Sequence, residues 1–221
     1  MNSLVRKLLF VPKCMVCGRV ADKDNICDKC FDELKNQKIR PGDMPEKDID
    51  FVDKVYASYH YDGAARRALL RAKINNPSSF LTGFTEYISV DIRRILEENK
   101  VDMIISAPFH TSKLYKSEYD LPCEMAKRIS KIFDIEYRTP VRKIKSTPKQ
   151  HDLSKEERKA NLIGAFKVTE PVNGKSILII DDVITTGNTL SNIALELRAA
   201  GRSRVYRWAY TLNEFKEKGD R

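Results

Sequence analysis

SILIIDDVITTGNTL, residues 176–190, is the stretch that decides the fold. It begins with four consecutive aliphatic residues after the turn dipeptide Asn173-Gly174. An uninterrupted apolar run of that length between turn residues is typical of a strand that is buried on both faces. Asp181 and Asp182 follow at once, and on an extended chain their side chains point to opposite faces. Because open parallel sheets bind ligands at the carboxyl ends of their strands, we expect these acids to lie at such an edge.

The loop after the two acids is small and rich in hydroxyl groups. It leads into a helical pattern at 190–200 that Gly201 ends, and it comprises Thr185, Thr186, Gly187, Asn188 and Thr189. Backbone N–H groups, threonine hydroxyls and the positive end of a helix dipole together suit an anion. The pattern therefore predicts a phosphate-binding loop. The neighbouring carboxylates can accept hydrogen bonds from sugar hydroxyls or hold Mg²⁺ through water.

Two other kinds of structure share part of this pattern. An aliphatic strand that ends in Asp-Asp is also found where P-loop ATPases bind magnesium. That pattern requires a glycine five residues before Gly174, where the chain has Thr169, and a lysine that opens a helix. The second alternative is a buried strand that ends in an ordinary turn. It is disfavoured because short turns rarely need two acids and three threonines.

Two Cys-x-x-Cys pairs near the amino terminus, Cys14/Cys17 and Cys27/Cys30, are separated by nine residues. Each pair can present two thiolates from one tight turn, and two such turns complete a tetrahedron around zinc. The segment is too small to bury a core of its own, so the metal is expected to supply most of its folding free energy. Zinc with four thiolate ligands has no open position, which makes its role structural. Disulfides or unrelated thiols are the alternatives.

Composition sets broad limits on function. The 221 residues carry 40 Lys and Arg against 31 Asp and Glu, a net charge of +9. This excess favours polyanionic partners but does not choose between a phosphorylated metabolite and nucleic acid. No run approaches the roughly 18 apolar residues of a membrane span, and the apolar patch at 8–11 is too short for a signal-peptide core. We therefore expect a cytoplasmic protein, in which cysteines favour metal or free thiols over disulfides.

The rest of the chain alternates short apolar runs with helical patterns. We predict strands at 53–61, 101–106, 135–138, 166–168 and 204–210, and helices at 64–73, 81–99 and 122–133. Such alternation predicts an open parallel α/β sheet flanked by helices. The domain division is a cysteine module at 1–37, a linker rich in proline, glycine and charge at 38–52, and the α/β domain at 53–221.

Three further features of the sequence lie outside the central stretch. The long charged segment 138–160 has no apolar periodicity, so we predict a loop that is either functional or disordered. The cations of helix 64–73 are expected to face solvent rather than a ligand, and they are Arg66, Arg67, Arg71 and Lys73. The fifth cysteine, Cys123, is expected to be a small residue on a helix.

The segment 177–189 resembles the phosphoribosyl pyrophosphate (PRPP) motif of type I phosphoribosyltransferases, through both acids and the whole loop. The resemblance implies that Asp181 and Asp182 contact the ribose 2′- and 3′-hydroxyls and act in catalysis, while the loop binds the 5′-phosphate. The PRPP site would then comprise Asp181, Asp182, Val183, Thr185, Thr186, Gly187, Asn188 and Thr189. The turn after strand 101–106 would receive pyrophosphate through Ala107, Pro108 and the residues up to Thr111. Segment 138–160 would be a flap that closes over the site.

A second series of residues, between 147 and 166, points to one family among proteins with this domain. Together with the four-cysteine module, the chain resembles the competence protein F (ComF) family through Thr147, Gln150, Leu153, Ser154, Arg158, Asn161 and Phe166. Members join an amino-terminal zinc finger to a phosphoribosyltransferase-like domain, and the likeness covers nearly the whole chain. One departure is that residues 117–121 read SEYDL where members usually carry Arg-Gly-Phe-Asn-Gln. It bears on catalysis more than on PRPP binding.

The resemblance implies a protein that binds PRPP with Mg²⁺, acts in natural transformation and DNA uptake, and carries a structural Zn²⁺. A catalytic member would displace pyrophosphate at C1 of ribose with a nitrogen acceptor. The alternatives are a non-catalytic PRPP sensor that binds single-stranded DNA or DNA-uptake proteins, and a nucleobase salvage enzyme. His151 in the flap is a candidate acid or base, although a solvated histidine is the simpler interpretation.

Overall fold

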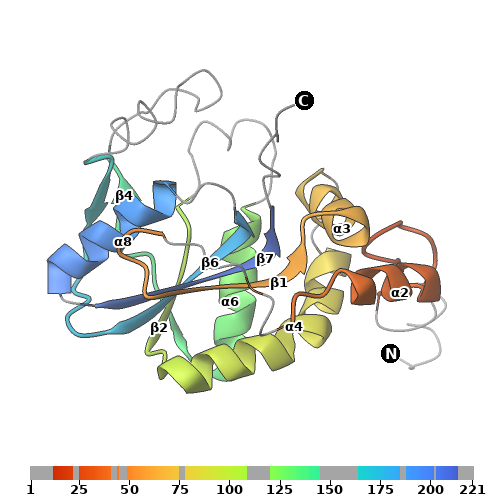
Figure 1. Cartoon of the computed structure of the whole chain (residues 1–221), viewed down its shortest axis with the longest axis horizontal. Coiled ribbons are helices and arrows are strands. Elements are labelled where there is room, and N and C mark those ends of the chain that lie inside the picture. The colour runs from red at the N-terminus through yellow and green to blue at the C-terminus, as the bar shows by residue number, and fades with distance from the viewer. Residues whose placement is uncertain are drawn as a thin grey trace, which may run out of the picture.

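The computed structural model describes residues 12–21, 25–40, 44, 49–74, 78–108, 120–144, 164–184, 188–201 and 203–213. At its centre is a five-stranded sheet in the order β1-β7-β6-β2-β3, in which every neighbouring pair is parallel (Figure 1). The strands are β1 (Lys54–His60), β2 (Met103–Ser106), β3 (Glu136–Tyr137), β6 (Ser176–Ile184) and β7 (Arg204–Leu212). The open parallel α/β sheet predicted from the sequence is confirmed.

Helices cover both faces of this sheet (Figure 1). On one face, Leu178 and Trp208 pack in a cluster with side chains of α3 (Gly63–Ile74), α4 (Ser78–Asn99) and α6 (Leu121–Phe133). On the other face, Ile177 and Ile179 pack with side chains of α8 (Asn188–Gly201). Alternate residues of a strand point to opposite faces, so β6 must be apolar on both. This is why the four aliphatic residues run without interruption.

The region after β3 departs from the sequence-based expectation. Residues 138–160 were expected to form a loop, yet they contain β4 (Val141–Lys143), which pairs antiparallel with β5 (Phe166–Val168). These two strands form a separate small sheet, so β5 does not join the parallel sheet as predicted. The physical reason is that Val141 and Phe166 are buried in the cluster beneath α8. Residues 145–163, with His151 and most of the predicted flap, lie outside the described residues.

The cysteine module packs on the sheet domain. Its helix is α2 (Asp28–Asn36), and Leu34 lies in the same apolar cluster as side chains of α3 and α4. Backbone hydrogen bonds continue into the sheet, because His60 N–H donates to Gln37 O at 2.9 Å and Ile39 N–H donates to Ser58 O at 2.9 Å. The boundaries 1–37, 38–52 and 53–221 stay a prediction.

Among the described residues, no helix is both long enough and apolar enough to cross a membrane.

Candidate functional site

The two acids and the turn after β2 meet at one edge of the sheet. β2 pairs with β6 up to Ser106 and Ile180, and Asp181 is the next residue of β6. Ala107 N–H donates to Ile180 O at 2.9 Å, which places the turn 107–108 beside the acids. The structure therefore brings together Ala107, Pro108, Asp181 and Asp182, which the sequence assigned to one site. Their contact with a ligand stays a prediction.

Asp181 is held by an arginine from the neighbouring strand. Arg207 Nη2 donates to Asp181 Oδ2 at 2.5 Å and to Val183 O at 3.2 Å, and the Arg207 side chain is only 2% exposed. Asp181 Oδ1 accepts the N–H of Asp182 at 2.8 Å. Burial raises the pKa of Asp181, and the charge of Arg207 opposes this rise. Within the described part of the chain, Arg207 Nε and Nη1 have no hydrogen-bond partner, so burying this side chain carries a cost.

Asp182 points to the other face and has a different cation. Its Oδ2 forms an ion pair with Nζ of Lys73, at the carboxyl end of α3. The two side chains are 17% and 34% exposed, so this pair is more open to solvent than the Asp181 pair. Opposite orientation of the acids follows from strand geometry. Each acid thus has its own counter-ion, one from each side of the sheet.

Sequence reasoning did not find these counter-ions. Lys73 was expected to face solvent with the other cations of its helix, but it contacts the site, and Arg67 of the same helix pairs with Glu33. Arg207 did leave a signal, because it is a lone charge inside the apolar run of β7, where charges are rarely buried unless paired. Lys73 left none, since nothing in its surroundings separates it from the solvated cations of α3.

The predicted phosphate loop is described in part. Residues 185–187, that is Thr185, Thr186 and Gly187, lie outside the described residues. Asn188 and Thr189 form the first turn of α8, so the helix begins directly after the loop, close to the position expected from the sequence. An α8 amino terminus at this place can offer backbone N–H groups to an anion near the acids.

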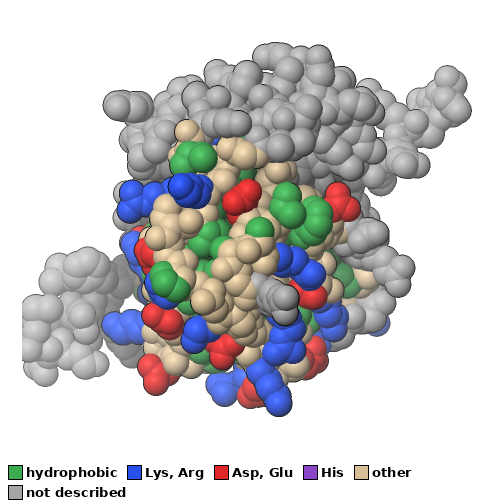
Figure 2. Space-filling model, turned by 90° about the vertical axis from the view of Figure 1, so that its left-hand side faces the viewer, with side chains coloured by type: hydrophobic (Ala, Val, Ile, Leu, Met, Phe, Trp, Pro, Cys, Tyr) green, Lys and Arg blue, Asp and Glu red, His purple; other side chains and the backbone are tan. Residues whose placement is uncertain are grey.

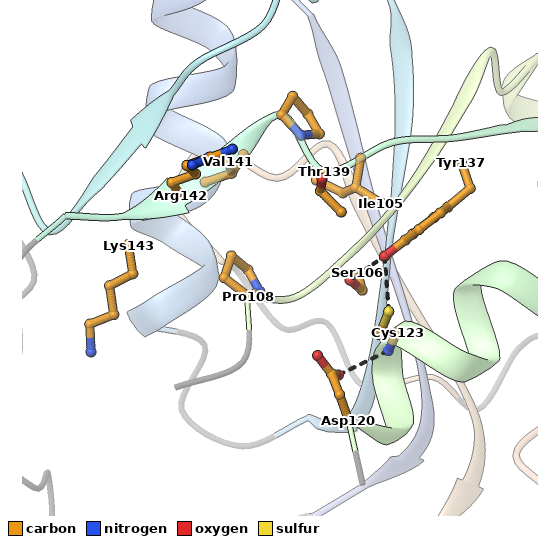
Figure 3. Close-up of a pocket in the computed structure, with 11 residues that line it drawn as sticks. Ile105, Ser106, Pro108, Asp120, Cys123, Tyr137, Thr139, Val141, Arg142 and Lys143 are labelled. Carbon is orange, nitrogen blue, oxygen red and sulfur yellow. Dashed lines mark hydrogen bonds between the residues drawn. The ribbon is translucent and has the colours of Figure 1, made fainter. Parts of the chain in front are cut away.

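A cavity of about 390 Å³ is lined in part by Pro108 and lies between the ends of β2 and β3, β4 and the start of α6 (Figure 3). A short chain of polar contacts lines its wall. Tyr137 Oη lies 3.1 Å from Ser106 Oγ and 3.2 Å from Cys123 Sγ. Burial and the Cys123 thiol raise the pKa of Tyr137 to about 12. Cys123 is on a helix as expected, but its thiol faces this cavity.

Charges of both signs stand around the same cavity (Figure 3). Arg142 and Lys143 reach it from β4, and Asp120 reaches it from the amino-terminal cap of α6. Burial lowers the pKa of Lys143 and raises the pKa of Asp120. The volume suits a small molecule, but the mixed lining does not select one charge class. No sequence motif marks Tyr137, Arg142 or Lys143, so the sequence did not predict that they line a cavity.

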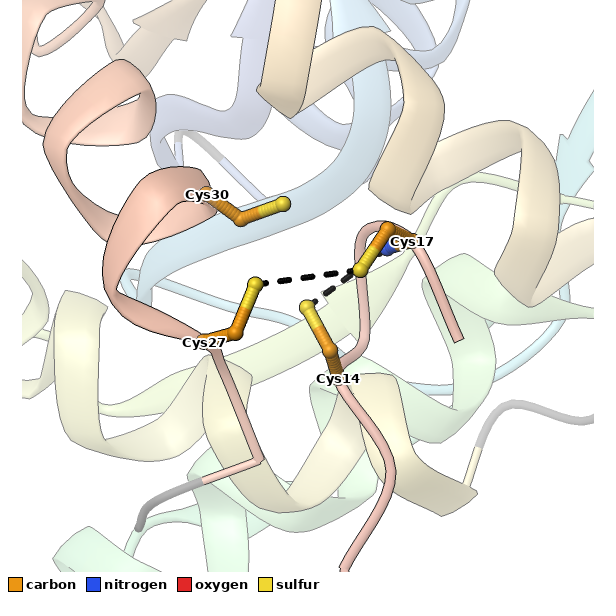
Figure 4. Close-up of side chains that lie close together, drawn as sticks. All are labelled: Cys14, Cys17, Cys27 and Cys30. Carbon is orange, nitrogen blue, oxygen red and sulfur yellow. Dashed lines mark hydrogen bonds between the residues drawn. The ribbon is translucent and has the colours of Figure 1, made fainter. Parts of the chain in front are cut away.

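The four cysteines of the two pairs converge on one point (Figure 4). Their Sγ atoms all lie within 4.8 Å of one another, and Cys17 Sγ lies 3.8 Å from Cys27 Sγ. A Zn–S bond of about 2.3 Å separates the sulfurs of a tetrahedron by about 3.8 Å, so the geometry fits zinc. All four are free cysteines, which excludes disulfides among them here. The prediction that Cys14, Cys17, Cys27 and Cys30 are positioned to bind one metal ion is confirmed.

Local structure explains how the cysteine pairs are presented. The first pair turns at Gly18, whose φ is 75° and whose N–H donates to Cys14 O at 2.8 Å. Cys27 is the residue before α2, and Cys30 lies in the first turn of that helix. Although burial raises it, the pKa of the Cys17 thiol falls to about 6 because of hydrogen bonds from Arg19. A low thiol pKa favours the thiolate that binds metal.

Comparison with known proteins gives consistent results. The family model described as "Phosphoribosyl transferase domain" matches residues 123–206. The chain is 33% identical over 203 residues to "DNA utilization protein YhgH" of Salmonella typhi, with 88% of each chain covered. It is 28% identical over 203 residues to the protein of the same name in Escherichia coli O6:H1, again with 88% of each covered.

A third relative is "Competence protein F" of Haemophilus influenzae, which is 25% identical over 202 residues and also covers 88% of each chain. A solved structure titled "Structure of the allosteric regulatory enzyme of purine biosynthesis" aligns with a TM-score of 0.34 and 20% identity. That alignment covers 52% of this chain and 24% of the other, and nothing about the site follows from it.

Proposed function

The chain belongs to the ComF family, and from this premise we propose that it binds PRPP together with Mg²⁺ at the edge formed by Asp181, Asp182, the α8 amino terminus and the turn 107–108. The observation that carries the proposal is the pair of acids in the carboxyl-terminal part of a central parallel strand, β6, which ends at Ile184, with α8 starting at Asn188 further along the chain. This is the place where open α/β sheets bind phosphorylated ligands.

We propose that each group binds a different part of the ligand. The first turn of α8, with Asn188 and Thr189, would bind the 5′-phosphate through backbone N–H groups and the helix dipole. Asp181 and Asp182 would accept hydrogen bonds from the ribose hydroxyls. The turn 107–108 lies one strand away and would receive the pyrophosphate, whose charge bound Mg²⁺ would offset.

Turnover is the finer part of the proposal. A phosphoribosyl transfer breaks the bond between C1 and the pyrophosphate oxygen, forms a bond from C1 to a nitrogen acceptor, and releases pyrophosphate. Stabilisation of the departing anion is then the main task of the protein. Of the SEYDL departure at 117–121, residues 117–119 lie outside the described residues, whereas Asp120 caps α6 and Leu121 is its first residue. We therefore propose binding first and transfer second.

A role in DNA uptake is the second candidate, because relatives are named for competence and DNA utilization. The net charge of +9 is compatible with single-stranded DNA as a partner. On the described part of the face shown in Figure 2, however, Lys and Arg are interspersed with Asp and Glu rather than gathered in one patch. Direct DNA binding would give an affinity that falls steeply with salt concentration.

We also propose that the four cysteines hold Zn²⁺ in a structural role. The 3.8 Å separation of Cys17 and Cys27 Sγ supports a tetrahedral thiolate site. Bound zinc would tie the turn at Gly18 to the start of α2. With four thiolates as ligands it leaves no position open for a substrate.

Calorimetric titration of the zinc-loaded protein with PRPP and Mg²⁺ tests the main proposal. We expect saturable binding that Asp181→Asn/Asp182→Asn abolishes and that Asp32→Asn, at an exposed position of α2, leaves unchanged. Pyrophosphate release in the presence of one nucleobase from a panel would establish transfer. Absence of binding in the parent protein would overturn the proposal.

A further inference from the structure

The cysteine module contacts helix α3 through one ion pair and one hydrogen bond. Arg67 of α3 makes a bidentate pair with Glu33 of α2, with Nη1–Oε1 at 3.0 Å and Nη2–Oε2 at 2.7 Å. Gln37, directly after α2, accepts the N–H of Ala65 through Oε1 at 3.0 Å. This N–H lies in the first turn of α3, where helix donors need partners from outside the helix. The module therefore caps α3 and sets its direction.

The first cysteine turn adds a third contact further along the same helix. A Cβ atom placed on Gly18 would lie 2.4 Å from Cζ of Arg71, so the guanidinium occupies the space that a side chain would take. Alanines of α3, among them Ala68 and Ala72, lie in one apolar cluster with Cys14 and Cys30. α3 is thus in contact with the metal-binding turns along most of its length.

The far end of the helix reaches the proposed PRPP site. Lys73 is two residues beyond Arg71 and pairs with Asp182. Figure 1 shows α3 between α2 and the sheet, so one rigid helix spans the distance from the module to the acids. We expect a change in how α2 holds α3 to displace Lys73, because hydrogen bonds join each turn of a helix to the next.

We propose that Lys73 is a positioning residue of the PRPP site and that the cysteine module holds it there through α3. The inference rests on the proposed function. PRPP carries a phosphate and a pyrophosphate, so two uncompensated carboxylates beside it would repel it. Arg207 neutralises Asp181 from a buried position, whereas Lys73, at 34% exposure, neutralises Asp182 and remains free to shift when ribose hydroxyls reach that carboxylate. A cation that α3 holds close to Asp182 therefore lowers the repulsion between this carboxylate and the approaching polyanion.

The test measures PRPP affinity of the zinc-loaded protein over a series of Mg²⁺ concentrations. Lys73→Met should weaken binding roughly tenfold and raise the Mg²⁺ concentration that half-saturating binding requires, since one cation near the ligand is lost. Lys73→Arg should keep the affinity within about twofold. A merely structural contact of the lysine stem would not separate these two variants in their Mg²⁺ dependence.

The role of the module is tested with a loosened variant, Glu33→Gln/Gln37→Met, which removes the charge of the Glu33–Arg67 pair and the acceptor that Gln37 offers to Ala65 N–H. We expect about a two- to threefold loss of PRPP affinity in the parent and no further loss in the Lys73→Met background, because coupled residues are not additive. The matched control is Glu98→Gln on α4, whose pairs with Lys54 and Arg94 lie away from α3. An equal loss in both backgrounds would overturn the inference.

Hydrogen–deuterium exchange separates this inference from the proposed function. The loosened variant should exchange faster at 70–74 of α3 and at 181–184 of β6, while Glu98→Gln should not. If the parent binds no PRPP, the proposed function fails, and exchange alone then decides whether α2 controls the end of α3. Unchanged exchange at both segments overturns the inference.

Discussion

The two candidate sites of this chain are built in opposite ways. The four cysteines come from one short segment, and two turns of the local backbone bring their Sγ atoms within 4.8 Å of one another. The two acids are adjacent in sequence, but the groups that make their environment come from β7 and from α3. A metal site of closely spaced ligands is therefore visible in the sequence, whereas the electrostatics of an acid pair depend on tertiary structure.

The largest effect should come from the local site. Chelation of the metal, or Cys14→Ser, is expected to unfold the module around α2, because zinc contributes on the order of 10 kcal/mol to the folding of zinc-finger peptides. Loss of α2 also removes the contacts of Glu33 and Gln37 to α3. Metal content and thermal unfolding measure the result. Cys123→Ser is the matched control and should keep the full metal content, since Cys123 lies at the cavity beside Tyr137.

The nonlocal site is broken most directly by Arg207→Met. The substitution leaves Asp181 without its counter-ion and should lower the unfolding free energy by roughly 3 kcal/mol, the cost of breaking a buried ion pair. Urea unfolding measures it. Arg94→Met on α4, which removes an exposed pair with Glu98, should cost less than about 1 kcal/mol. Equal costs for the two variants would show that Arg207 does not act as a buried counter-ion.

The same contrast explains what the sequence could and could not predict. The apolar run of β6, the acids after it and the helix that begins at Asn188 follow from local pattern, because burial on both faces requires such a run. β4 was not predicted because its three residues lie in a charged segment. Only the packing of Val141 beneath α8 makes them a strand. The ion pair of Lys73 with Asp182 was not predicted, because nothing near either residue in the sequence indicates it.

The pH dependence of the Arg207→Met variant sharpens the comparison further. Burial raises the pKa of Asp181, and loss of the arginine charge raises it more. A carboxyl whose pKa is raised on folding contributes stability below its unfolded pKa and loses it as pH rises through the folded pKa. The deficit of Arg207→Met should therefore shrink as pH falls from neutrality, which urea unfolding at several pH values would measure. A deficit that stays constant would mean that Asp181 does not carry the lost charge.

The smallest expected effect on stability concerns the contact between the first cysteine turn, at Gly18, and Arg71 of α3. Gly18 has a φ of 75°, and Gly174 has a φ of 65°, so alanine at either position costs about 1 kcal/mol of left-handed backbone strain. A Cβ at Gly174 meets nothing within 4 Å, whereas a Cβ at Gly18 meets the Arg71 guanidinium. The additional cost of Gly18→Ala over Gly174→Ala in thermal unfolding therefore isolates the contact between the first cysteine turn and α3. Arg71→Ala should remove that additional cost, because the space beside Gly18 is then free. If the additional cost persists in Arg71→Ala, it arises from strain within the cysteine turn. The stability of the cysteine site would then not depend on its contact with α3.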